Sequence, residues 1–150
     1  MAYKYAYDEE EKQYQPPKLQ TNRSMWKLMI LNFLTLGIYG IVFFVPFSMD
    51  LDKIDPRRSR GKTMNYIVAY FFSLFTFAII IDIWHYNIAG RIEEALERRH
   101  IDYEFNTGVF WKWYILGSLI FVGPFIYFYK LCKAMNLLCQ SYNEKPVLDE

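Results

Sequence analysis

A single carboxylate inside a long apolar run is the residue whose position most strongly suggests chemistry. Asp82 follows three isoleucines, and His85 comes three residues later, on the same side of a helix. A carboxylate among apolar side chains is costly, so it usually faces a partner, a cavity or a conduction path. Asp82 and His85 are therefore a candidate proton- or cation-responsive pair. The alternative, which we favour, is that Asp82 reaches the polar interface, or binds Arg91 or a lysine on a neighbouring helix.

A second polar pair lies in the first apolar run. Asn32 and Thr35 are followed closely by Gly37 and Gly40. Polar side chains in such runs mostly hydrogen-bond between helices or back to a carbonyl, and glycines allow bending or close helix contact. We expect all four residues to serve helix contacts, and we weigh ligand binding as the less favoured alternative.

A basic cluster follows the first run and consists of Arg57, Arg58, Arg60 and Lys62. If this loop is cytoplasmic, the cluster could bind anionic lipid head groups, at about 1 kcal/mol per basic residue. The equally favoured alternative is a loop whose charges only set the orientation of the chain. The net charge of +1 gives no indication of a nucleic-acid partner.

The residues that usually mark enzymes and metal sites do not form a known pattern here. The chain has two histidines and two cysteines, and it contains no nucleophile elbow, zinc-binding helix motif, phosphate-binding loop or Cys-x-x-Cys pair. Cys132 and Cys139 would lie about 10 Å apart on one helix, too far for a disulfide. We expect a protein that is not an enzyme, with no cofactor and no metal.

The elements that would position these residues are three long apolar runs, at about residues 25–49, 64–88 and 109–130. The chain is 53% hydrophobic and 20% aromatic, and charges gather between the runs. Each run has about the 20 residues that a helix needs to cross about 30 Å of hydrocarbon. The sequence thus predicts an all-α integral membrane protein with three hydrophobic helices, each followed by a short amphipathic helix.

The expected domain boundaries follow from composition. Residues 1–20 have few aliphatic side chains and are predicted to form a disordered tail. The membrane domain is expected to cover residues 21–143, and residues 144–150 form a C-terminal tail.

The three units resemble one another. Offsets of 41 and then 43 residues align the aromatic residues Phe43, Trp84 and Tyr127. The same offsets align three polar residues, Asp52, Glu93 and Asn136. We infer a threefold internal repeat.

The orientation of the runs stays open. With three full crossings, the basic residues divide almost equally between the two faces, so the positive-inside rule does not decide. The alternative is that each run is a re-entrant hairpin, which would put all basic clusters on one face.

Several motifs resemble an uncharacterised family of small bacterial membrane proteins, domain of unknown function 4234, over residues 21–143. The resemblance implies a bacterial, Gram-positive source and a multi-pass protein of the plasma membrane, with no known activity. Pro46 departs from the family pattern and argues against a continuous first exit helix. The motifs are Thr35-Leu36-Gly37-Ile38-Tyr39-Gly40, Gly61-Lys62-Thr63-Met64, Trp84-His85, Arg98-Arg99 with Ile101 and Tyr103, Phe110-Trp111-x-Trp113, Val122-Gly123-Pro124-Phe125-Ile126-Tyr127 and Lys133-Ala134-Met135-Asn136-Leu137-Leu138.

Three functions are compatible with these features. We favour a non-enzymatic packing, scaffold or sensor module whose partners are the lipid bilayer and a second copy or another membrane protein. The alternative is a subunit of an oligomeric channel or transporter, with Asp82 and His85 on the path. A membrane-embedded enzyme is the third and least favoured. It would need polar catalytic groups that converge at one depth, and only Asp82 and His85 qualify.

Overall fold

The computed structural model describes residues 16–56, 64–76 and 78–146, and all regular structure in these ranges is helical. The chain therefore has an all-α fold. Its elements are α2 (Met25–Leu34), α3 (Ile38–Ile54), α4 (Tyr66–Ser73), α5 (Ile79–Arg98), α6 (Thr107–Val109), the π-helical segment η1 (Phe110–Ile115), the 3₁₀ segment η2 (Leu116–Ile120) and α7 (Gly123–Glu144).

Each of the three apolar runs is broken by a turn instead of forming one long helix. The first run divides into α2 and α3, the second into α4 and α5, and the third into η1, η2 and the start of α7. Among the helices of the described ranges, none combines the length with the apolar composition that crossing a bilayer requires. The prediction of an integral membrane protein with three spanning helices was wrong, and so was its multi-pass plasma-membrane location.

Each break contains a residue in the left-handed conformation. Gly37, Ala78 and Phe121 have φ angles of 96°, 67° and 58°. A residue in this conformation ends a right-handed helix and lets the chain reverse. The three residues lie 41 and 43 residues apart, the offsets at which the sequence units superpose. The repeating unit is thus a helical hairpin with a short first arm and a long second arm.

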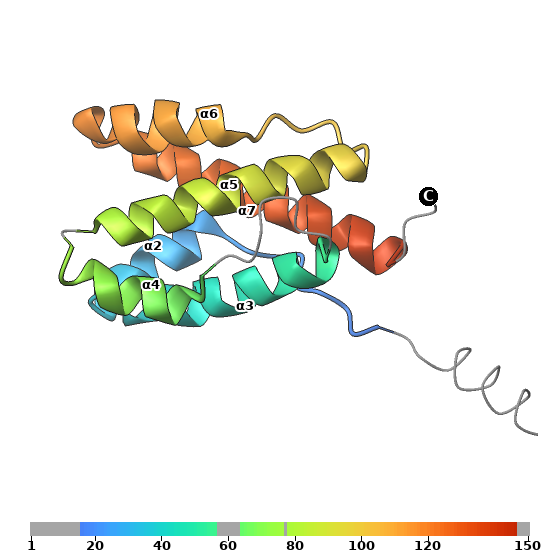
Figure 1. Cartoon of the computed structure of the whole chain (residues 1–150), viewed down its shortest axis with the longest axis horizontal. Helices are drawn as coiled ribbons and strands as arrows, with labels where there is room; N and C mark the ends of the chain where they lie inside the picture. Colours follow the sequence, from blue (N-terminus) through green and yellow to red (C-terminus); the bar gives the residue numbers. More distant parts are fainter. Residues whose placement is uncertain (1–15, 57–63, 77, 147–150) are drawn as a thin grey trace, which may run out of the picture.

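The three hairpins lie side by side with their turns at one end, on the left of Figure 1. The long arms α3, α5 and α7 pack against one another in the centre. Each short arm packs on its own long arm and on the long arm of the preceding hairpin. Thus α4 contacts α5 and α3, while α2 contacts α3 and α7, so the arrangement closes into a ring.

Residues at equal positions of the long arms fill the core in layers. One layer contains Phe47, Ile88 and Leu131, and the next contains Leu51, Ile92 and Met135; all six side chains are fully buried. Burial of such side chains is the main favourable term in folding. The core therefore lies between the long arms.

The start of the packed domain and the course of α3 differ from expectation. Leu19 is buried, and its backbone amide and carbonyl both bond to the side-chain amide of Asn143, at 2.6 and 2.8 Å. The packed domain therefore begins within the predicted tail, of which residues 1–15 lie outside the described residues. Helix α3 also continues through Pro46, so the interruption expected there does not occur.

Candidate functional site

His85 lies in an aromatic layer of the core. It occupies the same position on α5 as Phe44 on α3 and Phe128 on α7, and the ring centroids are 5.1 Å (Phe44–His85), 5.5 Å (His85–Phe128) and 6.2 Å (Phe44–Phe128) apart. Its side chain is buried, and this burial lowers the pKa of His85 to about 3. The imidazole is therefore neutral at physiological pH, and it fills a position that its two counterparts fill with phenylalanine.

Two tyrosines of the third hairpin surround this imidazole. The Tyr127 hydroxyl lies 3.4 Å from His85 Nδ1 and also donates to the His85 carbonyl at 3.4 Å. The Tyr114 ring centroid lies 5.3 Å from that of His85. Burial raises the pKa of both hydroxyls well above the usual value, so both remain protonated donors.

Asp82 faces Tyr114 rather than His85. The Tyr114 hydroxyl donates to Asp82 Oδ1 at 3.1 Å, and in the described part of the chain no bond joins Asp82 to His85. Partial burial raises the pKa of Asp82, and the bond from Tyr114 opposes that shift. Arg91, the partner considered from sequence, instead pairs with Asp52 at 2.8 Å. Sequence reasoning missed Tyr114, because an aromatic residue in an aromatic-rich run carries no distinguishing signal.

Replacing His85 with phenylalanine tests whether His85 serves as a neutral, buried ring in the aromatic layer. Because the unfolded imidazole titrates near pH 6.5 and the buried one near 3, the unfolded state binds the extra proton as pH falls through this window. His85 therefore destabilises the fold progressively from pH 6.5 down to about 3. We expect His85→Phe to fold at pH 7 and to lose less stability on acidification, as measured by urea unfolding at several pH values. An unchanged pH dependence would contradict this placement of His85.

The polar residues of the first run join the two arms of one hairpin. The Thr35 hydroxyl donates to the Leu31 carbonyl and accepts from the Tyr39 amide, both at 2.8 Å. Asn32 Oδ1 accepts from the Gly40 amide at 2.8 Å. These bonds satisfy backbone groups that the break would otherwise leave without partners.

The two glycines allow close approach of tyrosines from the second hairpin. A Cβ at Gly37 would lie 3.0 Å from the Tyr70 hydroxyl, and one at Gly40 would lie 3.4 Å from the Tyr66 hydroxyl. Gly37 and Gly40 thus lie where the first hairpin meets the second, as helix-contact residues do. The predicted lipid cluster of Arg57, Arg58, Arg60 and Lys62 lies outside the described residues.

An ion-pair belt, which sequence reasoning missed, lies at the end of the bundle away from the turns. Arg23 pairs with Asp50 at 2.5 Å, Arg91 pairs with Asp52, and Arg98 pairs with Asp55. The guanidinium groups of Arg23 and Arg91 are almost fully buried. The charged amphipathic segments after each run were the available signal, but their pairing depends on how the long arms pack.

The polar position that repeats in the three units, at Asp52, Glu93 and Asn136, also has a structural role. Asn136 bonds to the backbone amide and carbonyl of Arg23, at 2.9 and 2.8 Å, where the first short arm begins. Glu93 accepts a bond from the Thr107 amide at 3.2 Å, where the third short arm begins. Asn136 and Glu93 each tie a long arm to the start of the next hairpin in the ring.

Large apolar side chains are exposed at the three turns, and we call this region the tip surface. Leu36 is 90% exposed and Phe121 is 85% exposed, and both have a positive φ that is unfavourable for their residue types. An exposed apolar surface of this kind marks a binding surface. The tip surface consists of Phe33, Leu34, Leu36, Ile38, Leu74, Phe75, Ile79, Leu119, Ile120, Phe121 and Val122.

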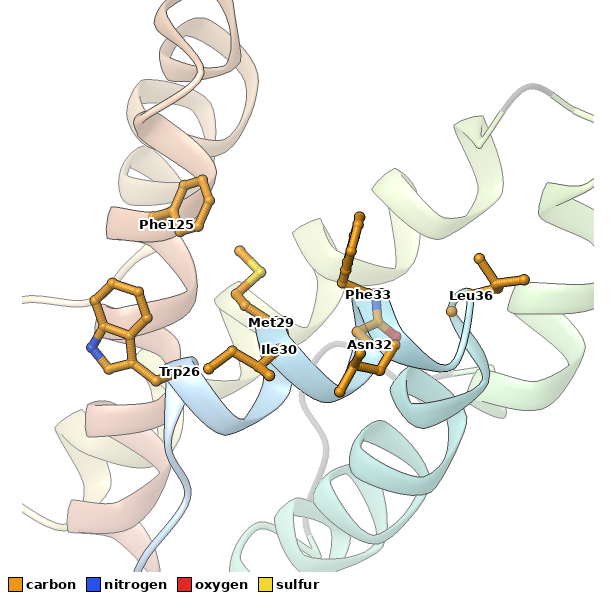
Figure 2. Close-up of a pocket in the computed structure, with 9 residues that line it drawn as sticks. Trp26, Met29, Ile30, Asn32, Phe33, Leu36 and Phe125 are labelled. Atoms are coloured by element: carbon orange, nitrogen blue, oxygen red, sulfur yellow. The ribbon is translucent and has the colours of Figure 1, made fainter.

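An apolar groove adjoins the tip surface between α2 and the start of α7. Figure 2 shows Trp26, Met29 and Ile30 along α2, with Phe125 facing them from α7. The groove has a volume of about 650 Å³ and extends to Leu36 at the first turn. Asn32 is its polar lining residue, and its oxygen is already bonded to the Gly40 amide.

Comparison with known proteins identifies one family. The model of a domain of unknown function, DUF4234, matches residues 23–94. This range covers the first hairpin and most of the second, whereas the third lies outside it. No curated protein and no solved structure matches the chain.

Proposed function

We propose that this chain, which carries a DUF4234 domain over residues 23–94, is a non-enzymatic scaffold or sensor module. It binds one leaflet of a lipid bilayer through its hairpin turns. In this arrangement the three turns enter the hydrocarbon and return, and no segment crosses. The ion-pair belt and the charged ends of the long arms stay in water.

The observation that carries the proposal is the tip surface. Leu36 and Phe121 adopt a costly backbone conformation at the apex of a turn and still point away from the protein core. Water favours neither the conformation nor the exposure, whereas hydrocarbon favours the exposed side chains by about 25 cal/mol per Å² of apolar surface removed from water. Because the turns lie at the same end of the bundle, one planar surface can cover them all (Figure 1).

The length of the short arms suits a single leaflet. From Trp26 to Leu36 the chain advances roughly 15 Å at 1.5 Å per residue. Half of a hydrocarbon core of about 30 Å has the same thickness. The first turn would thus reach the middle of the bilayer while the beginning of α2 lies at its boundary.

Residues suited to a membrane boundary occupy that level. Trp26 and Trp111, near the start of the first and third short arms, are exposed, and each is followed by an exposed lysine, Lys27 or Lys112. Indole rings and lysine side chains are favoured at the head-group level. Between these lysines and the turns of the first and third hairpins lie only uncharged residues. In the second hairpin Asp82 lies about 6 Å past the turn, and the Tyr114 hydroxyl donates to it there.

Aspartate substitutions at the turns test the proposal. Aspartate adopts positive φ more readily than leucine or phenylalanine, so Leu36→Asp and Phe121→Asp should preserve the fold. Moving an aspartate into hydrocarbon costs about 3 kcal/mol, which corresponds to about a hundredfold weaker partitioning for each variant. Co-flotation of the full chain with phosphatidylcholine–phosphatidylglycerol vesicles measures this.

Met49→Asp is the matched control. Met49 is also exposed, but it lies on α3 about 18 Å from the turn at 1.5 Å per residue, beyond the proposed boundary. This variant should float with vesicles as the wild type does. Equal loss in all three variants, or no loss at the turns, would exclude insertion through the tip surface.

A further inference from the structure

We infer that the groove between α2 and α7 binds one anionic phospholipid, with an acyl chain along the groove and the phosphate beside Lys27. This inference rests on the proposed function, because the lipid would come from the leaflet that the turns enter. It goes further by assigning a binding site for one lipid molecule per chain to one side of the bundle.

The groove has the size and chemistry of a ligand site. Its volume of about 650 Å³ lies within the range of about 300–1,000 Å³ in which proteins hold small molecules. Its walls are aliphatic and aromatic, and Asn32 offers no free oxygen because that atom accepts from Gly40. A polar ligand would lose most of its hydrogen bonds with water there and regain few of them, because Asn32 and Trp26 carry the only side-chain N–H donors among the lining residues. A hydrocarbon chain makes no hydrogen bonds with water, so it loses none when it enters the groove.

The direction of the groove matches that of a lipid in a leaflet. One end is at Leu36, on the tip surface, and the other is at Trp26, at the proposed boundary. Lys27 follows Trp26 and lies three residues before Ile30, so its exposed side chain lies on the flank of α2 beside these two residues, just outside the residues that line the groove. A cation at the boundary end and hydrocarbon along the rest complement the phosphate and acyl chain of one lipid.

The groove lies beside α2, at its place in the ring of hairpins. Each short arm packs in the angle between two long arms, and α2 fits between α3 and α7. Near the turns, α7 begins at Gly123 and presents Phe125 to the groove across from Met29 and Ile30 (Figure 2). The space between these side chains is continuous with the tip surface, so a lipid could enter laterally from the leaflet.

Native mass spectrometry of the full chain, taken into detergent from phosphatidylglycerol-containing vesicles, tests the site. We expect one phosphatidylglycerol per wild-type chain. Ile30→Trp should fill the groove and lower lipid occupancy about tenfold or more, as overpacking of a site does. Ile67→Trp, at a similarly exposed position on α4, should leave occupancy unchanged.

Charge is tested in the same way. Lys27→Gln should lower retention of phosphatidylglycerol, whereas Lys112→Gln, at the boundary of the third hairpin, should not. Retention by Ile30→Trp, or equal loss from Ile67→Trp, would overturn the site. A dimer that Ile30→Trp dissociates would also overturn it, because a second copy would then occupy the groove.

Vesicle flotation separates this inference from the proposed function. Ile30→Trp should still float, because the turns are unchanged, so loss of bound lipid with normal flotation supports both ideas. A wild-type chain that floats but carries no retained lipid would overturn the groove site alone. A chain that retains one lipid in detergent but does not float would overturn leaflet insertion and leave the groove site supported.

Discussion

Replacing Gly123 with alanine should open or unfold the third hairpin. A Cβ at this position would lie 2.2 Å from Gly117 Cα and 2.3 Å from the Trp113 carbonyl oxygen. Both contacts are with backbone atoms, which cannot move aside as a flexible side chain can. We expect a loss of about 3 kcal/mol or more of unfolding free energy, well above the gain of about 1 kcal/mol that alanine brings to a helix.

Urea unfolding of the full chain in detergent, followed by helical circular dichroism, measures this loss. Gly40→Ala is the control, because the atoms nearest to its Cβ would belong to side chains and not to the backbone: the Asn32 amide oxygen at 3.0 Å and the Tyr66 hydroxyl at 3.4 Å. We expect that variant to stay within about 1 kcal/mol of the wild type. If Gly123→Ala proves as stable as Gly40→Ala, the close contact between the arms of the third hairpin does not exist.

The length of the apolar runs predicted helices correctly, but it did not reveal where they break. Gly37 is the one turn residue whose type permits a positive φ without strain. Ala78 and Phe121 adopt the same conformation with residue types that normally avoid it. Their breaks follow from the tertiary packing of the hairpins. The repeat offsets carried the missing information, because they relate both positions to Gly37.

The candidate site, like the fold, could be predicted only in part from the sequence. The spacing of Asp82 and His85 placed them on one side of a helix, but a helical face does not reveal what packs against it. The third hairpin supplies Tyr114 to Asp82 and Tyr127 to His85, across 32 and 42 residues of sequence. The offsets would have helped with His85, because they align it with Phe44 and Phe128 and so predict an interior aromatic position.

Replacing Asp50 with alanine should cost about 3–5 kcal/mol of unfolding free energy, the usual loss when one partner of a buried ion pair is removed. The Arg23 side chain is 2% exposed, and its guanidinium donates to Asp50 at 2.5 Å. It also donates to the Gln20 carbonyl and contacts Cys139 Sγ, so it is held in place on several sides. Without Asp50 it remains buried with an uncompensated charge. Urea unfolding at pH 7 measures the loss.

Two further variants show whether the loss of stability in Asp50→Ala comes from the buried, unpaired charge of Arg23 or from the removal of any ion pair. Lys53 pairs with the same carboxylate at 3.3 Å but is 43% exposed, so Lys53→Ala should cost less than about 1 kcal/mol. The double variant Arg23→Met with Asp50→Leu removes both charges and should recover much of the stability lost in Asp50→Ala, since apolar pairs often replace buried ion pairs without loss. If the double variant is no more stable than Asp50→Ala, Arg23 acts mainly through its bond to the Gln20 carbonyl, which fastens the chain before α2 to the long arms.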